Sequence, residues 1–496
     1  MMPDADRNPI DHRARQAEDS VRRSSNSTLA GALILTLYGC ASLAPTVAVP
    51  VPAAWSAADD AVMTGGASLA HWWSRFDDPR LSQLVTQALA SNTSVKSAEA
   101  TLRQARALRD VAAAGLWPWV DGSASARHAT SGGQSAGDRF ETGLDASWEL
   151  DIFGANRSAV AASDASVRAS TASLGDVQVS IAAEVALDYM TLRGAQTRLA
   201  IADDNLASQL ETLQITQWRL QAGLTTSIEA EQARADAEQT RAKVPVLRTS
   251  IEQTRHALAV LTGQPPAALA TQLAAPGPVP RAADDLVLSL PAETLRQRPD
   301  VRAAEAQVAA ALARVAQANA ARAPNFQLGG SLGLDALTLG ALTNSASAVS
   351  VLLASVTLPV FDGGALRAEV RAQQAALDLA SADYRATVLT ALKDVEDALA
   401  ALRGDRERLS HLQLATVAAG NAARLARQRY GSGLVDFQVV LDTQRTQLDT
   451  QDSVASASVD LSADHVRLYK ALGGGWRPDT GEASPSSTGA PRAPRS

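Results

Sequence analysis

Apolar and polar residues alternate in two stretches of the chain, at 140–150 and at 326–334. A period of two over about ten residues predicts β-strands of membrane length, with one face toward lipid and one toward water. The residues predicted on the lipid face are Phe140, Leu144, Trp148, Phe326, Leu328 and Leu332. Such alternation is also normal in a soluble hairpin packed on a helical domain, so the pattern alone leaves both interpretations open.

Two much longer stretches, 157–221 and 366–430, are predicted to be helices. The second contains no proline, and its 65 residues would form roughly 98 Å of helix. Gly223 and Gly433 are predicted to end these helices as C-terminal glycines, with new helices starting near residues 228 and 437. The resulting antiparallel hairpins are too long for a compact domain, so they are expected to pack as an extended bundle.

The chain repeats itself after about 208 residues. Composition explains the matching alanines, but not the matching glycine, proline and phenylalanine residues, so we interpret the chain as two copies of one module. Each copy is read as a helix, two strands, a long helix and a further helix. The anchors are residues 98–100 with 304–306, 150–153 with 358–361, and 192–194 with 402–404.

The start of the chain resembles an export signal. Residues 29–38 are an apolar run that follows Arg22 and Arg23 and is too short to span a bilayer, so it is predicted to be the core of a signal peptide. Cys40 follows the run directly after a glycine, as in a bacterial lipoprotein box, and is predicted to be acylated. The alternative is that Cys40 is incidental to an ordinary cleavage site.

These patterns divide the chain into six predicted segments. They are a signal peptide (1–39), a lipidated N-terminal tether (40–70), the first repeat (71–265), a linker (266–290), the second repeat (291–476) and a disordered tail (477–496). The expected fold class is mainly α with a small β part.

Composition excludes several classes of function. A net charge of −7 gives no basic footprint for nucleic acid, and a single cysteine excludes a disulfide framework, a cysteine zinc site and an iron–sulfur cluster. The six histidines lie far apart, and no nucleophile or phosphate-binding motif is present. We therefore expect no catalytic residues, no metal site, no cofactor and no enzymatic activity.

The predicted strands require an oligomer if they enter a membrane. Four strands cannot close a barrel, and open sheet edges are not tolerated in hydrocarbon. Three chains would supply twelve strands, an even number within the range of outer-membrane barrels. A homotrimer is the smallest simple solution.

Seven segments resemble the TolC-type outer-membrane efflux proteins, in particular their OprM- and NodT-like lipoprotein branch. The resemblance extends from about residue 55 to residue 476, and SWELDIFG and LYKALGGGW are its most specific motifs. The segments are WWSRFDDPRL (72–81), GLWPWV (115–120), SWELDIFG (147–154), RPDVRAAEA (298–306), LPVFDGG (358–364), RYGSGLVDFQVVLDTQR (429–445) and LYKALGGGW (468–476).

The resemblance implies a trimer with a twelve-stranded barrel and an α-helical periplasmic tunnel. It implies docking to a periplasmic membrane-fusion adaptor and to an inner-membrane pump, usually of the resistance-nodulation-division type. The protein would be a passive exit duct for small molecules, lipid-anchored in the outer membrane of a Gram-negative bacterium with a large periplasmic part.

The two glycine turns would then lie at the far periplasmic end, where the hairpins of three chains converge. Asp436 and Asp442 follow Gly433 by three and nine residues, whereas Thr226 and Gln232 hold the matching positions after Gly223, with Glu229 between them. Relatives narrow the tunnel with acidic rings in this hairpin, which makes Asp436 and Asp442 candidates for the pore constriction. Either carboxylate could instead be a helix N-cap or a solvated surface charge.

Two other functions fit part of the pattern. A periplasmic coiled-coil scaffold or adaptor lipoprotein would have the same helices but no pore. An outer-membrane duct for type I protein secretion would share the barrel, but the lipoprotein-like box disfavours it.

Overall fold

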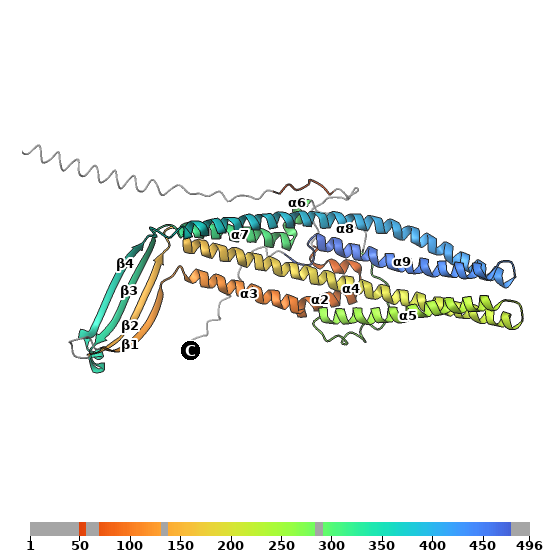
Figure 1. Ribbon diagram of the computed structural model, residues 1–496, viewed down its shortest axis with the longest axis horizontal. Helices are drawn as coiled ribbons and strands as arrows, with labels where there is room; N and C mark the ends of the chain where they lie inside the picture. The colour runs from red at the N-terminus through yellow and green to blue at the C-terminus, as the bar shows by residue number, and fades with distance from the viewer. Residues whose placement is uncertain (1–48, 56–68, 130–136, 283–290, 478–496) are drawn as a thin grey trace, which may run out of the picture. The chain divides into compact units, whose positions relative to one another are not determined.

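The computed structural model describes residues 49–55, 69–129, 137–282 and 291–477. The chain divides into two compact units, of which the first, residues 1–48, lies outside the described part. The signal peptide and Cys40 belong to that unit, so the structure does not test them. The second unit holds all the elements described below (Figure 1).

The two halves of the second unit contain helices of matching lengths. The short helices that precede the strands have 22 residues each, the long helices have 67 each, and the returning helices have 35 each. The tandem repeat and the long hairpins are therefore confirmed. The pairs are α3 (Thr93–Ala114) and α7 (Pro299–Ala320), α4 (Ala155–Gln221) and α8 (Ala365–Gly431), and α5 (Ser227–Leu261) and α9 (Phe437–Ala471).

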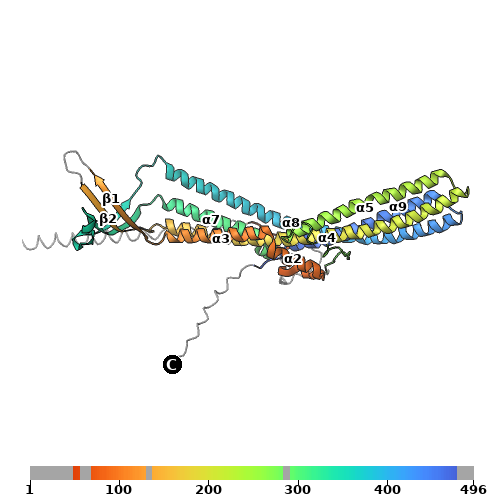
Figure 2. The same cartoon turned by 90° about the horizontal axis from the view of Figure 1, so that it is seen from below.

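The observed helix ends lie close to the predicted ones because the chain carries clear stop signals. The 67-residue helices are about 100 Å long, and each ends two residues before its glycine, Gly223 or Gly433. The shorter elements that precede α3 and α7 are η1 (Leu69–Phe76), α2 (Pro79–Ser91) and α6 (Pro291–Gln297). Figures 1 and 2 show α5 running back beside α4, and α9 beside α8.

The two predicted strand pairs join in one antiparallel sheet in the order β1-β2-β3-β4. The join is between β2 and β3, which are separated by all of the first helical hairpin, and it pairs Phe140 with Ala336 and Leu150 with Phe326. Within the described part of the chain, β1 and β4 are the two edges of the sheet. The strands are β1 (Trp119–Ala129), β2 (Gly137–Leu150), β3 (Asn325–Ala336) and β4 (Ala348–Thr357).

Helix α4 is central to the packing, since it contacts α3, α5, α7 and α9. Its buried positions are mostly small, and two glycines allow especially close approach. A Cβ atom at Gly175 would lie 2.6 Å from the ring of Trp476, and one at Gly194 would overlap Val459 of α9. An alanine-rich composition thus permits long helices to pack with few bulky side chains.

The main hydrophobic core joins two motifs from opposite ends of the described chain. Trp72, in the WWSRFDDPRL segment, stacks on Tyr469, in LYKALGGGW, with ring centroids 5.3 Å apart. The Gly475 amide donates to the Leu69 carbonyl at 3.0 Å, and a Cβ at Gly474 would lie 2.9 Å from Trp72. The glycines in the second motif are therefore needed for this close contact.

A buried polar network supports the same core. Arg193 of α4 donates to the Tyr189 hydroxyl at 2.8 Å, and that hydroxyl donates to Asp78 at 2.9 Å. Asp78 also caps α2 by accepting from the backbone amides of Arg80 and Leu81. Burial raises the pKa of Tyr189 to about 12, so this hydroxyl remains a donor at neutral pH.

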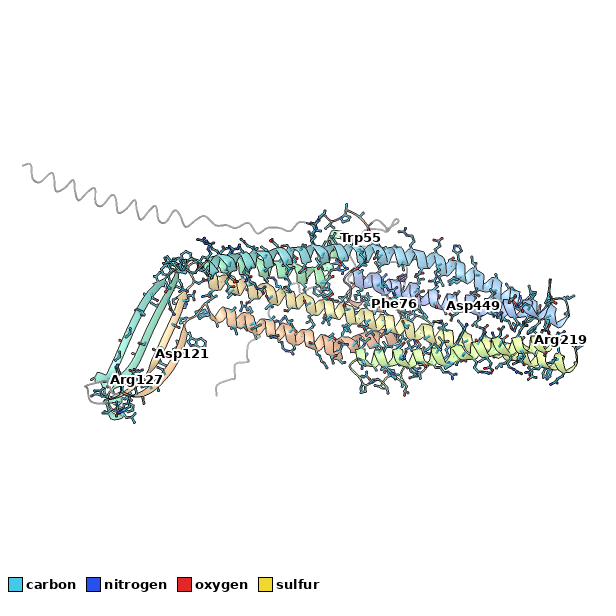
Figure 3. The ribbon with its side chains drawn as sticks, in the orientation of Figure 1. Trp55, Phe76, Asp121, Arg127, Arg219 and Asp449 are labelled. Carbon is cyan, nitrogen blue, oxygen red and sulfur yellow. The ribbon has the colours of Figure 1, made fainter. Side chains whose placement is uncertain are left out.

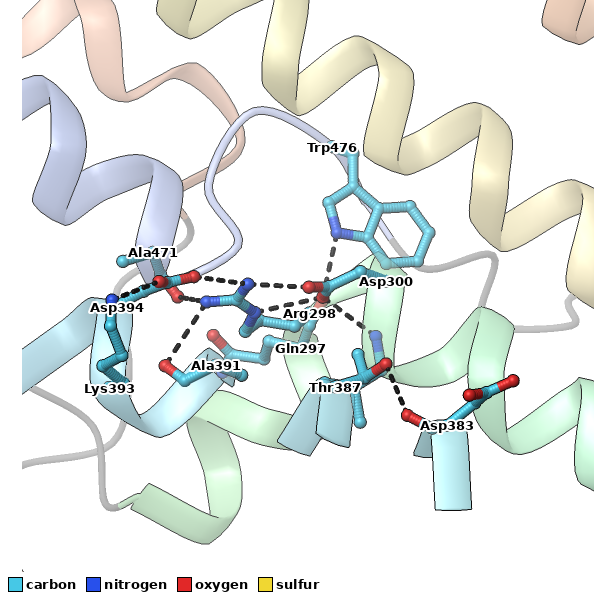
Figure 4. Close-up of polar contacts among 11 residues, drawn as sticks. Gln297, Arg298, Asp300, Asp383, Thr387, Ala391, Lys393, Asp394, Ala471 and Trp476 are labelled. Carbon is cyan, nitrogen blue, oxygen red and sulfur yellow. Dashed lines mark hydrogen bonds and ion pairs between the residues drawn. The ribbon is translucent and has the colours of Figure 1, made fainter. Parts of the chain in front are cut away.

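Arg298 of the RPDVRAAEA segment ties α7 to the other repeat helices (Figure 4). Its guanidinium bonds Asp300 and, on α8, Asp394 at 3.3 Å, and it donates to the last-turn carbonyl of Ala471 in α9 at 2.9 Å. A cation at a helix C-terminus also opposes the negative end of the helix dipole. One buried arginine thus links three helices of the second repeat.

Two segments expected to be a tether and a linker contribute to the core. Trp55, within the predicted tether, is buried beside Val395 and Leu468. Leu269 and Leu273, within the predicted linker, are fully buried in the main core. Composition made these segments look irregular, but single large apolar residues anchor them to the helices.

Candidate functional site

The two hairpins end in turns of the same geometry. Gly223 has a φ of +69° and Gly433 a φ of +72°, a conformation that residues with a side chain rarely adopt. The amide of the leucine after each glycine donates to a carbonyl five residues back, at 2.8 and 2.9 Å, while each glycine amide donates three residues back. These are Schellman motifs, which satisfy the last carbonyl groups of the long helices.

The tips of the two hairpins contact each other through an arginine and an aromatic ring. Arg219, near the end of α4, lies 4.4 Å from the ring centroid of Tyr430, near the end of α8, and donates to its carbonyl at 3.3 Å. Phe437 packs against the same ring at 5.3 Å. Figure 3 shows Arg219 beside the turns. The matching position in the first hairpin is Leu220, so the two tips are not equivalent.

A second link lies further along the hairpins. Arg445 of α9 bonds Asp236 of α5 through two nitrogen atoms, at 2.6 and 3.0 Å. Asp236 is only 4% exposed, and its hydrogen bonds raise the pKa of Arg445. Removing one partner of such a pair would leave the other charge uncompensated. Residues 209 positions apart form this pair, so no local sequence signal could predict it.

The two candidate constriction residues have exposed side chains near the start of α9. Asp436 occupies the N-cap position of α9, but its side chain accepts no capping hydrogen bond and is exposed. Asp442 is exposed, accepts from Gln438 at 2.9 Å and lies 3.7 Å from Arg445. In the first hairpin Thr226 does cap its helix, accepting from the Glu229 amide at 3.4 Å.

A third exposed carboxylate lies on this helix and was not among the predicted residues. Asp449 is exposed and follows Asp442 by seven residues, which places the two on the same helix face two turns apart. Figure 3 labels it on α9. The seven-residue spacing was present in the sequence and could have revealed it.

The sheet has one apolar face and one polar face. The register pairs Leu144 with Leu332 and Trp148 with Leu328, so all six residues predicted to face lipid lie on the same side. On β1, β2 and β3 the opposite side carries Asp121, Asp145 and Arg139, along with other polar and small residues and, at the start of β1, Trp119. The contact of the apolar face with lipid itself stays a prediction.

Aromatic residues gather where the strands meet the helices. Trp117, Phe153 and Phe361 are exposed there, and Phe153 lies 6.4 Å from Phe326. Trp148 is partly buried and donates to the Leu116 carbonyl at 3.0 Å. The amphipathic indole rings of Trp117 and Trp148 at this junction suit the boundary between lipid and water.

The described residues contain no cluster of three or more histidine, cysteine, aspartate or glutamate side chains suited to a metal ion. Over the same residues, each helix is too short or too polar to cross a bilayer.

The chain matches the family model described as outer membrane efflux protein over residues 84–264 and 290–474. It is 32% identical to the pyoverdine export outer membrane protein OpmQ of Pseudomonas putida, over 90% of this chain and 97% of that protein. Outer membrane protein OprJ of Pseudomonas aeruginosa is also 32% identical, over 90% and 95%. Nodulation protein T of Rhizobium leguminosarum bv. viciae is 30% identical, over 90% and 93%.

Solved structures give the same result. The outer-membrane channel OprN superposes with a TM-score of 0.83 at 38% identity, covering 87% of this chain and 98% of that one. The open state of the MtrE outer membrane channel of Neisseria gonorrhoeae gives 0.76 at 28% identity, covering 87% and 96%. These relatives are transport channels of the outer membrane. Because the agreement extends over both repeats, in sequence and in architecture, the chain belongs to the outer membrane efflux protein family and is an efflux channel of the Gram-negative outer membrane with a large helical periplasmic part.

Proposed function

We propose that three copies of the chain form a passive exit duct, with a twelve-stranded barrel continuous with a helical periplasmic tunnel. The observation that carries this proposal is the single four-stranded sheet, whose edges are β1 and β4. One face of the sheet is apolar, and the other is mainly polar on β1, β2 and β3. Pairing β4 of one copy with β1 of the next would remove the open edges, which lipid does not tolerate.

The assembly also needs partners at its periplasmic end. We propose a periplasmic membrane-fusion adaptor at the hairpin tips and an inner-membrane pump of the resistance-nodulation-division type behind it. Leu224 and Leu434 support this, because both are large apolar residues that remain exposed at the two turns. The pump would supply the energy, and the duct would pass small molecules such as drugs and toxic compounds.

Assembly and conduction test this proposal together. Purified protein in detergent should have the mass of three chains, and after reconstitution in planar bilayers it should give discrete conductance steps. A monomer that gives no steps would contradict the duct and would favour a scaffold without a pore.

We further propose that Asp436 and Asp442 ring the periplasmic constriction, with Asp449 forming a second ring. Three copies of each carboxylate in a narrow pore would repel one another and favour cations. All three carboxylates are exposed at or near the start of α9, the helix that follows the Gly433 turn, and this supports the assignment. The Asp236–Arg445 pair, which joins α5 to α9 nearby, would hold the two hairpins together at this level.

Changing Asp436 and Asp442 to alanine tests the constriction. The double variant should fold normally, because neither side chain is buried and Asp436 makes no capping bond, and its cation selectivity in bilayer recordings should be reduced. The control is Gln232→Ala in the first hairpin, since Thr226 caps a helix and its loss would cost about 1 kcal/mol of stability. Wild-type selectivity in the double variant would move the constriction elsewhere, first to Glu229.

A further inference from the structure

Strand β4 breaks the alternation that the other strands follow. Its residues Val349, Val351 and Leu353 fall on the polar face of the sheet, opposite Gly333, Ser331 and Gly329 of β3. Val351 and Leu353 are 54% and 61% exposed. An apolar stripe therefore runs along a face that is otherwise polar.

The neighbouring strand β3 has no side chains large enough to cover this apolar stripe. The three β3 residues opposite the stripe have no side chain or only a hydroxymethyl group, and the nearest atoms to a Cβ built at Gly329 are 3.9 Å away. Gly333 is different, because a Cβ there would lie 2.7 Å from the Thr142 carbonyl of β2. The β3 positions beside the stripe therefore have little or no side chain, and at Gly333 there is no room for one.

Two carboxylates lie on the same face of the sheet, across β3 from the stripe. The register places Asp121 of β1, Asp145 of β2, Ser331 of β3 and Val351 of β4 in one row across the face. Asp121 and Asp145 are directly opposite each other, an arrangement that costs free energy unless a cation compensates it. Among the described residues, neither forms an ion pair, and Asp145 accepts only from Ser123 at 3.0 Å. Figure 3 shows Asp121 on the part of β1 nearer to α3.

We propose that this row and its neighbours form a binding strip for amphiphilic organic cations. The apolar part of such a molecule would lie on Val349, Val351 and Leu353, and its positive group would lie beside Asp145 and Asp121. Two strand spacings separate the valine from Asp145, about 10 Å. This inference rests on the proposed function, because it requires the polar face of the sheet to line the duct.

Binding of an amphiphilic cation requires both the apolar stripe and the two carboxylates. An inorganic cation gains from the carboxylates but not from the apolar stripe, and a neutral apolar molecule gains only from the stripe. A solvent-exposed strip binds weakly, which suits a duct because a transported molecule must also leave.

Block of ion current by two probe cations tests the strip. Tetraphenylphosphonium is apolar and positive, whereas tetramethylammonium is positive with little apolar surface. In planar bilayers tetraphenylphosphonium should block the wild-type channel at much lower concentration. Val351→Thr, which keeps the shape of the side chain, should weaken that block about 3- to 10-fold and leave block by tetramethylammonium unchanged. Asp145→Asn should weaken block by both cations.

Each variant has a matched control on the opposite face of the same strand. These are Val356→Thr in β4 and Asp138→Asn in β2, and both should keep the wild-type block. Repeating the measurements with Asp436, Asp442 and Asp449 changed to alanine removes the tip carboxylates as a competing cation site.

The outcomes separate this inference from the proposed function. If the channel conducts but Val351→Thr keeps the full tetraphenylphosphonium block, the apolar stripe takes no part and the inference is wrong, while the duct stands. If only Asp145→Asn has an effect, the strip is a simple cation ring, which also overturns it. If the wild-type protein gives no conductance steps, the proposed function fails and the strip fails with it.

Discussion

Gly194 and Gly404 hold equivalent positions in the two long helices but have different surroundings. A Cβ at Gly194 would overlap Val459, whereas one at Gly404 would meet no atom within 4 Å. We expect Gly194→Ala to lower the free energy of unfolding by about 1–3 kcal/mol through overpacking. Gly404→Ala should instead raise it by about 0.5–1 kcal/mol, because alanine favours the helix.

Thermal unfolding of the two variants in detergent provides the measurement, and each serves as the control for the other. A penalty at Gly404 comparable to that at Gly194 would contradict the prediction as it stands for one chain. It would show that a neighbouring copy packs against α8 at that position.

Asp464 is a buried carboxylate whose ionisation should affect stability. It is 1% exposed, and burial, opposed by Arg467 and reinforced by the carboxylate of Asp405, raises its pKa to about 6. The folded protein therefore keeps a proton that the unfolded chain releases near pH 4. The free energy of unfolding should fall as the pH rises from about 4 to about 6, by on the order of 1–3 kcal/mol, and then stay level.

Burial raises the pKa of Asp188 to about 6 as well, so the wild-type protein should show the sum of both effects. Asp464→Asn should reduce the dependence of the melting temperature on pH between about 4.5 and 6.5 and leave the contribution of Asp188. Asp460→Asn, which changes a half-exposed carboxylate on the same helix, should not reduce it. An Asp464→Asn variant with the full wild-type slope would rule out Asp464 as a source.

Single residues also mark the limit of what sequence could predict. The turn glycines were predictable because glycine alone suits the left-handed conformation that ends a helix in this way. Asp436 and Asp442 could be selected by their spacing from Gly433. That both side chains are exposed, and that Asp436 makes no capping hydrogen bond, could be seen only in the folded structure. The Asp236–Arg445 pair could not be foreseen, because only the packing of two distant helices brings its members together.

Among the elements, the sheet offers the sharpest test of the proposed membrane boundary. Leu144 lies on the apolar face of β2, and Ser147 lies on its polar face. If Leu144 is near the midplane of the bilayer, Leu144→Arg should cost about 2–4 kcal/mol and reduce the amount of folded trimer. Ser147→Arg should leave the trimer intact and mainly change the conductance.

Heat-stable migration on gels and bilayer recordings measure the two effects. Equal tolerance of arginine at both positions would remove the support for a lipid face on this side of the sheet.

Element lengths were predictable, but element pairing was not. The alternating stretches and the long proline-free run gave strands and helices close to those observed. The single sheet depends on β2 pairing with β3 across the whole first helical hairpin, and alternation alone does not define partners or register. The apolar stripe on β4 was missed for the same reason, since its face becomes visible only through pairing with β3.

For the whole molecule, the remaining prediction concerns the anchor. Cys40 lies outside the described residues, and its acylation rests on its position after the apolar run. Cys40→Ser should remove the lipid but keep trimer in the membrane fraction, because twelve strands supply most of the insertion free energy.

Mass spectrometry of the N-terminal peptide and extraction with and without detergent test this. An unmodified N-terminal peptide in the wild-type protein would refute the acyl anchor. Release of the serine variant into water would show that lipid alone holds the protein.

The equal lengths of the repeated helices restrict which insertions and deletions of residues they can tolerate. Since α4 and α8 both have 67 residues and their tips are joined by Arg219 and Tyr430, deleting one turn from either helix would draw its tip back by about 5 Å and break that contact. An equal deletion in the returning helix would also be needed to keep the hairpin in register. Insertions and deletions within the helices of the two hairpins should therefore survive only in matched sets, one in each arm of both hairpins.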